Sequence, residues 1–206
     1  SLVIGSGAGT KTILIESKKT GEANRLMFED DAKTFAIETV DDICVLTVDG
    51  ELIEVKNNRK PSSETMMHLE VYKTREDIMA IVHTHSKMAT SFTVLNKPIP
   101  AIIYEVATFG LKDAVVPVAP YARPGTVELA KSVIEPVKRA DIFLLEKHGV
   151  VACGTDMYEA FLRAQYVEEL AEVYYYTLLI NKGNQPDSFS PEELESWKYP
   201  EKLEKN

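Results

Sequence analysis

The sequence is poor in cysteine and has no long apolar run. Its 206 residues include two cysteines, Cys44 and Cys153, too few for a disulfide framework and without a CxxC spacing, so we expect two buried free thiols. Apolar runs such as Ile142–Leu145 are far shorter than the roughly 20 residues of a membrane-spanning helix. No charged-then-apolar signal segment opens the chain. These absences predict a cytoplasmic protein without a membrane partner.

Basic residues are scarce relative to acidic ones. Lys and Arg total 23 against 32 Asp and Glu, which gives a net charge of −9. Such a chain repels a polyanion, so we expect no nucleic-acid partner, and any anionic ligand needs a local positive site. The hydrophobic fraction of 45% is typical of a folded globular protein, and the length fits one domain. We therefore expect a single domain over residues 1–206, with a polar tail at 181–206.

Strand-like and helix-like segments alternate along the chain. The first third has the pattern of an antiparallel sheet, with a hairpin signal at Asp49-Gly50. Asp156 and Ser190 each begin a capping-box pattern, the second with a proline at the first helical position. The expected strands are Thr12–Ser17, Arg25–Phe28, Ile43–Val48, Met79–His85, Ala101–Tyr104, Ala114–Val118 and Asp141–Leu145. The expected helices are Glu64–Lys73, Met88–Leu95, Val127–Ile134, Asp156 to about Ile180, and a short one after Ser190.

Two of the four histidines, His83 and His85, stand one residue apart in a strand-like segment. In a strand, such residues face the same side about 6.6 Å apart, so that two imidazoles can converge on one ion. His148 is a candidate third ligand because it follows the buried run Ile142–Leu145 and precedes Gly149. Three imidazoles with an open fourth position are typical of catalytic zinc. Taken alone, the His-x-His pair fits equally well two histidines that cap a strand.

Several motifs surround these histidines in one order and at one spacing. They are Pro61-Ser62-Ser63-Glu64, Ile81–Ser86, Ile99-Pro100-Ala101, Ala119–Ala122, Gly125-Thr126 and Lys147–Gly154. Together they closely resemble the class II aldolase/adducin family over about Asn57 to Ile180. The resemblance implies an α/β fold, a three-layer α/β/α sandwich with a mostly antiparallel central sheet, and a homotetramer with active sites between subunits.

The resemblance also assigns the catalytic and metal-binding residues. By it, His83, His85 and His148 bind Zn²⁺ or another divalent cation, and Glu64 is the acid/base carboxylate, with contact to the resting metal as a further expectation. Tyr104 matches the tyrosine of the family's IPAIxY segment and would donate a proton on the aldehyde side from a neighbouring subunit. His68 lies one helical turn after Glu64, where it is either a fourth ligand or a residue that supports the ligands or packs beside them, with the second alternative favoured.

The substrate phosphate is assigned to two segments. Ser62 and Ser63 precede a helix, where hydroxyls and free N–H groups suit a phosphate, although plain capping is compatible with the same pattern. Gly9 and Thr10 stand in the family's glycine-rich segment. In the tail, Tyr199 is a candidate for closing the site, and Trp197 is another, with packing as the alternative role.

The chain departs from the family at its N-terminal end. It begins at Ser1, without the family's first helix, which we expect to be absent, and Thr10 replaces a phosphate-binding asparagine. Glu29-Asp30-Asp31-Ala32 replaces a TP(S/T)G turn, and its carboxylates would repel a phosphate. Either Ser62, Ser63 and the Gly5–Thr10 loop hold the phosphate alone, with Lys11, or the substrate is a differently substituted ketose or sugar acid.

The expected function is a zinc-dependent lyase that reversibly cleaves a ketose 1-phosphate, such as L-fuculose 1-phosphate, to dihydroxyacetone phosphate and an aldehyde. A ribulose-5-phosphate 4-epimerase and a methylthioribulose-1-phosphate dehydratase are alternatives on the same metal site. Pro61-Ser62-Ser63-Glu64 favours the aldolase, because the epimerases usually carry PSSD and the dehydratases PSAE. An adducin-like module without enzymatic activity is disfavoured, because such domains lack the three histidines.

Overall fold

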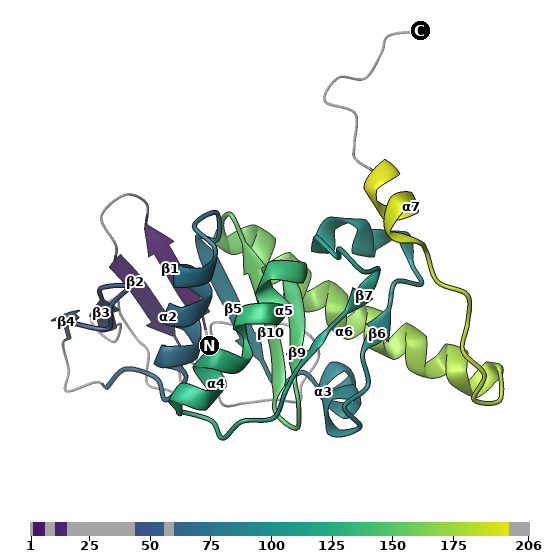
Figure 1. Ribbon diagram of the computed structural model, residues 1–206, viewed down its shortest axis with the longest axis horizontal. Helices are drawn as coiled ribbons and strands as arrows, with labels where there is room; N and C mark the ends of the chain where they lie inside the picture. Colours follow the sequence, from purple (N-terminus) through teal and green to yellow (C-terminus); the bar gives the residue numbers. More distant parts are fainter. Residues whose placement is uncertain (1, 7–10, 16–43, 56–59, 198–206) are drawn as a thin grey trace, which may run out of the picture.

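The computed structural model describes residues 2–6, 11–15, 44–55 and 60–197, and its centre is one eight-stranded sheet (Figure 1). The strand order is β4-β3-β2-β1-β5-β10-β9-β8, and every neighbouring pair is antiparallel except the parallel pair of β8 and β9. The strands are β1 Leu2–Ser6, β2 Lys11–Ile15, β3 Cys44–Leu46, β4 Leu52–Glu54, β5 Ala80–Thr84, β8 Val118–Ala119, β9 Ile142–Leu145 and β10 Gly149–Gly154. A separate pair joins β6 Ile99–Pro100 to β7 Val115–Val116.

Helices cover both faces of this sheet (Figure 1). The helices are α2 Thr65–Thr74, α3 Lys87–Val94, the 3-10 helix η2 Tyr104–Phe109, α4 Val127–Ser132, α5 Ile134–Arg139, α6 Met157–Ile180 and α7 Pro191–Ser196. One face packs against α2, α4 and α5, and the other against α3, α6 and η2. The mostly antiparallel three-layer α/β/α sandwich is thus confirmed.

The alternating side chains of the central strands create two separate cores. In β5, Ala80 and Val82 belong to the core under α3 and α6, whereas Ile81 belongs to the core under α2 and α4. The buried strand β10 divides in the same way, with Val150 on one face and Val151 on the other. Because alternate residues of a strand point to opposite faces, His83 shares the face of Ile81, toward α2.

The expected caps and turns are present. Asp156 accepts a hydrogen bond from the Glu159 N–H (2.8 Å), while the Glu159 carboxylate accepts one from the Thr155 N–H (2.7 Å). Ser190 caps α7, and Gly50, with φ of 89°, forms the turn between β3 and β4. Both cysteines are buried thiols that form no disulfide, as predicted. No helix among the described residues is long and apolar enough to cross a membrane.

Three predicted elements are wrong in detail, and prolines explain two of them. The predicted strand Ala114–Val118 is divided at Pro117, which lacks the N–H that a ladder needs. The predicted helix Val127–Ile134 is two helices, because Pro136 has no N–H to bond the Ser132 carbonyl and continue α4.

The third error is the predicted strand Ala101–Tyr104. The strand there is Ile99–Pro100, and Tyr104 begins a 3-10 helix that ends at Gly110 in the left-handed conformation. Ala101 is fully buried, and Ile102 and Ile103 are partly buried against the same core. The apolar run is therefore a loop packed on the core, which has the same sequence pattern as a short strand. The predicted strand Arg25–Phe28 lies outside the described residues.

Candidate metal centre

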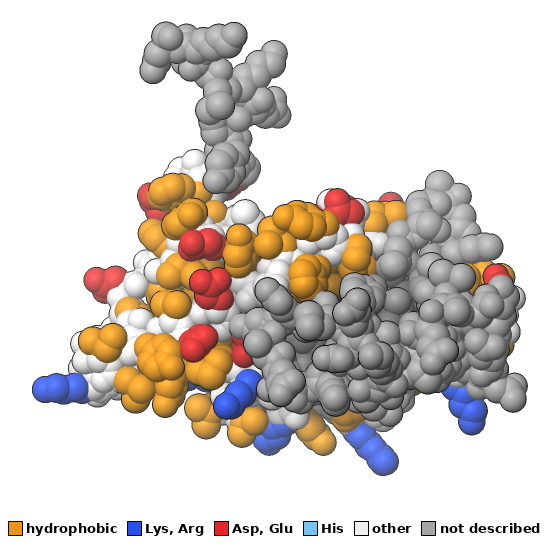
Figure 2. Space-filling model, turned by 180° about the vertical axis from the view of Figure 1, so that it is seen from behind, with side chains coloured by type: hydrophobic (Ala, Val, Ile, Leu, Met, Phe, Trp, Pro, Cys, Tyr) orange, Lys and Arg blue, Asp and Glu red, His pale blue; other side chains and the backbone are white. Residues whose placement is uncertain are grey.

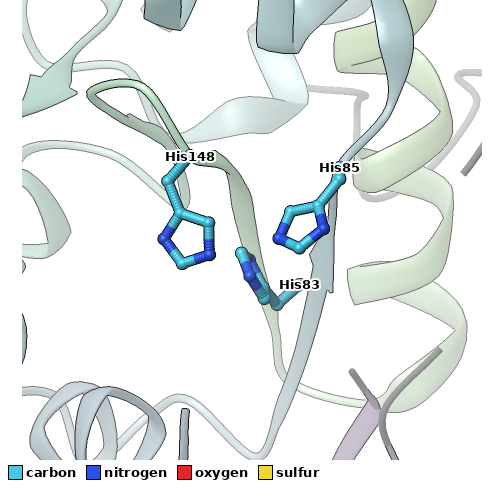
Figure 3. A group of neighbouring side chains, drawn as sticks. All are labelled: His83, His85 and His148. Carbon is cyan, nitrogen blue, oxygen red and sulfur yellow. The ribbon is translucent and has the colours of Figure 1, made fainter. Parts of the chain in front are cut away.

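Three histidines from two distant segments converge at one end of β5 and β10 (Figure 3). His83 lies within β5, His85 follows its last residue, and His148 lies in the connection between β9 and β10. One ring nitrogen from each lies within 4.8 Å of the others, and the ring centroids are 4.9 to 5.0 Å apart. The structure thus brings together the three residues that the sequence pattern singled out. It differs from the expectation in that His85 lies just beyond the strand.

His83 is held in one orientation by the strand that pairs with its own. Its Nδ1 lies 2.7 Å from the carbonyl oxygen of Val150. A carbonyl only accepts, so this contact places the ring proton on Nδ1 and leaves Nε2 as the coordinating atom of the neutral ring. Burial, followed by the neighbouring histidines, lowers the pKa of His83 well below its ordinary value. The ring is therefore neutral at pH 7, the protonation state that a metal ligand requires.

The turn that carries His148 is fixed by backbone contacts. The His148 N–H donates to the Leu145 carbonyl (3.0 Å), and the preceding residue, Lys147, has φ of 56°. A left-handed conformation is uncommon for a residue with a side chain, so surrounding contacts must hold it. One such contact is the hydrogen bond from the Lys147 N–H to the Thr93 carbonyl (3.1 Å) at the end of α3.

Gly149 permits the close packing of the two ligand segments. A Cβ atom on this residue would lie 2.4 Å from the Thr84 carbonyl oxygen, 2.6 Å from Cδ2 of His85 and 3.3 Å from Cε1 of His83. Both shorter distances are below any normal contact, so only glycine fits here without a shift of the backbone. The absence of a side chain at Gly149 thus allows His83 and His85 to lie close to His148.

Glu64 is buried directly before α2, on the side of the sheet that His83 faces. Its side chain is only 4% exposed, and its N–H donates to the Ser62 hydroxyl (3.1 Å). It was expected in the first turn of α2, and it occupies the N-cap position. Its carboxylate is not part of the group of three histidine nitrogens. Ser62 is half-buried, whereas Ser63 is exposed and lies against Gly125 of the α4 entry loop.

His68 is fully buried one turn into α2, with its ring centroid 6.3 Å from that of His83. Neither of its ring nitrogens has a hydrogen-bond partner among the described residues. Burial lowers its pKa well below the ordinary value, so the ring is neutral at pH 7. It is not among the three converging residues, which agrees with the supporting or packing role favoured from the sequence.

Tyr104 is not brought to the three histidines by the fold of this chain. It is 54% exposed at the start of η2, and its ring lies against Trp197, with the centroids 5.8 Å apart. Trp197, a candidate for closing the site, thus packs against Tyr104, the candidate proton donor. Gly9, Thr10 and Tyr199, and the acidic turn Glu29–Asp31, lie outside the described residues.

The three histidines fit a divalent cation. Tetrahedral coordination with bonds of about 2.0–2.1 Å places imidazole nitrogens roughly 3.4 Å apart, and the three ring nitrogens here all lie within 4.8 Å of one another. Three imidazole nitrogen donors suit zinc and its transition-metal neighbours better than Mg²⁺ or Ca²⁺, which prefer oxygen. The Val150 carbonyl, the orienting partner of His83, was missed from the sequence because strand register is needed to find it.

The comparison with known proteins agrees with this geometry. The model of the family described as "Class II Aldolase and Adducin N-terminal domain" matches residues 17–175. A 5-deoxy-D-ribulose 1-phosphate aldolase of Bacillus thuringiensis is 38% identical over 156 residues, which are 76% of this chain and 70% of the relative. An L-fuculose phosphate aldolase of Escherichia coli is 40% identical over 125 residues, which are 61% of this chain and 57% of the relative.

Comparison with solved structures identifies the same kind of protein. A solved structure of an L-fuculose 1-phosphate aldolase superimposes with a TM-score of 0.77 at 32% identity, covering 95% of this chain and 82% of the other. The family match spans most of the sequence, including all three converging histidines. The chain therefore belongs to the class II aldolase and adducin family.

Proposed function

We propose that this protein is a divalent-metal-dependent aldolase, with zinc as the resident metal, that reversibly cleaves a ketose 1-phosphate to dihydroxyacetone phosphate and an aldehyde. The convergence of His83, His85 and His148 is the observation that carries the proposal. The named activities of the relatives support the substrate class, and L-fuculose 1-phosphate and 5-deoxyribulose 1-phosphate are the first candidates.

The three histidines would hold the cation through one ring nitrogen each. A divalent cation bound there would supply Lewis acidity toward the substrate oxygens next to the carbon–carbon bond that is cleaved. Glu64 transfers the proton, because its carboxyl group is buried at the start of α2 on the side of the sheet that His83 faces. Ser62 and Ser63, at the entry to α2, bind the phosphate through their hydroxyl groups, which can donate to phosphate oxygens.

Oligomeric assembly is the second part of the proposal. Tyr104 is exposed and has no hydrogen bond or ring contact with the three histidines among the described residues, so its role as proton donor needs a site on a neighbouring subunit. Exposed apolar side chains also gather on the face seen in Figure 2, and the end of α6 exposes Tyr175, Tyr176, Leu179 and Ile180. Such patches are typical of subunit contacts. These observations support a homotetramer.

Purified protein loaded with Zn²⁺ should release dihydroxyacetone phosphate from L-fuculose 1-phosphate or 5-deoxyribulose 1-phosphate, detected by coupled reduction with NADH. Glu64→Gln should lower kcat at least about 100-fold with a smaller change in KM, because it removes the proton carrier but not the phosphate site. Absence of product from both substrates would contradict the aldolase. Conversion to an epimer or a dehydrated product would favour the corresponding alternative.

His148→Ala should abolish stoichiometric zinc binding, since two imidazoles remain of three, and mass spectrometry of the metal content after gel filtration measures this loss. The matched control is His68→Gln, which changes a buried histidine beside the cluster and should leave the zinc content near that of the parent protein. Equal zinc content in the parent protein and His148→Ala would refute the ligand set.

Gly149→Ala should both destabilise the protein by about 1–3 kcal/mol and weaken zinc binding, because the new Cβ displaces the Thr84 carbonyl and the His85 ring. Gly154→Ala, at the far end of the same strand, is the control: its Cβ would lie 2.5 Å from the Ala160 nitrogen, away from the site. Urea unfolding should give a lower free energy of unfolding for both variants. Competition with a chelating dye should show weaker zinc binding for Gly149→Ala alone.

Light scattering coupled to gel filtration should give a mass near four chains at micromolar concentration. Ile180→Glu together with Leu179→Glu, which places charge on the apolar end of α6, should reduce this mass. A parent protein that elutes as a monomer would argue against the assembly and against a role for Tyr104 in a neighbouring site.

A further inference from the structure

Glu168 is a buried carboxylate of α6 with an unusual set of partners. Its side chain lies within the apolar core under α3 and α6, and the residue is 5% exposed. One carboxylate oxygen accepts a hydrogen bond from the Met88 N–H and the other from the Ala89 N–H, each at 2.8 Å. Both donors belong to the first turn of α3. Glu168 thus binds the start of a helix that lies against its own.

These two hydrogen bonds replace a cap that α3 otherwise lacks. The first N–H groups of a helix have no partner within the helix, and a side chain at the N-cap normally satisfies them. At α3 the N-cap is Ser86, whose side chain makes no capping hydrogen bond. The carboxylate of Glu168 takes over this role from 80 residues away in the chain, and its negative charge also complements the positive end of the helix dipole.

The helix that Glu168 fixes joins two of the three converging histidines. At its start, only Ser86 separates α3 from His85. At its end, the buried Thr93 accepts the hydrogen bond from the Lys147 N–H, and Lys147 directly precedes His148. A shift of α3 along its axis would therefore move His85 and the Lys147–His148 segment together.

Packing alone gives no reason for a charge at this position. Glu168 shares the buried stripe of Ala164, Val167 and Ala171 on α6, where an apolar residue would fill the space. Among the described residues no Lys, Arg or His forms an ion pair with it, so its desolvation is offset by the two N–H groups and the helix end. An apolar side chain would leave those N–H groups buried without partners.

We propose that Glu168 is a positioning residue for the metal centre. By clamping the start of α3, it sets the location of His85 and, through Thr93 and Lys147, that of His148. This inference rests on the proposed function, since it assigns a role toward the metal that the three histidines are proposed to bind. Glu168 itself touches neither the metal ligands nor the substrate.

Titration with Co²⁺ tests the proposal, because both the dissociation constant and the visible absorption of the bound ion report ligand geometry independently of activity. Glu168→Gln keeps the shape but offers one oxygen acceptor and turns an NH₂ group toward the second N–H. We expect the dissociation constant for Co²⁺ to rise about tenfold, the low end of the effect of residues that orient ligands. The absorption bands of the saturated protein should also shift.

Glu159→Gln is the matched control, since Glu159 is also on α6 and accepts a backbone N–H, but at the Asp156 cap rather than at α3. It should lower thermal stability while leaving the Co²⁺ affinity and spectrum unchanged. If Glu168→Gln does not fold, Glu168→Asp keeps the charge with a shorter reach and is judged by the same two readouts.

Parent-like affinity and spectrum in the folded Glu168 variant would overturn the positioning role and leave the aldolase proposal standing. A parent protein that takes up neither Co²⁺ nor Zn²⁺ would instead refute the metal site, and the role of Glu168 with it.

Discussion

The antiparallel pairing of β5 with β10 is the contact on which the metal centre depends. It places Val151 opposite His83 and brings the Val150 carbonyl to the His83 ring, so that one strand carries a candidate ligand and its partner strand orients that ring. The same pairing draws Gly149 against Thr84 and His85, which explains why a glycine begins β10. Because the pairing joins segments more than 60 residues apart, the donor set exists only in the folded chain.

Much of this site could be predicted from the sequence, because its signals are local. His83 and His85 are separated by one residue and His148 follows a buried apolar run, so local pattern made all three candidates, and the flanking motifs of the family resemblance then selected them. The caps at Asp156 and Ser190 likewise depend on residues within three positions of each cap. The fold class followed from the family resemblance, and the alternation of strands and helices agreed with it.

The remaining features depend on contacts between distant segments. Glu168 lies on an apolar stripe of α6, and an acidic residue at such a position indicates a buried polar contact. Its partners on α3, however, can be found only from the packing of the two helices. The 3-10 helix at Tyr104 follows a loop packed on the core whose residues look like a strand, because burial gives both the same apolar pattern. Local sequence does not distinguish these cases.

The division of the sandwich into two cores affects which parts of the sequence can change independently during evolution. The face that bears His83 and Glu64 is built with α2 and α4, whereas α3 and α6 belong to the opposite layer. Substitutions can therefore accumulate in loops around the first face while the second layer stays fixed and keeps the three histidines together. Related proteins with this fold can in this way differ in the residues around the first face while the positions of the three histidines stay the same.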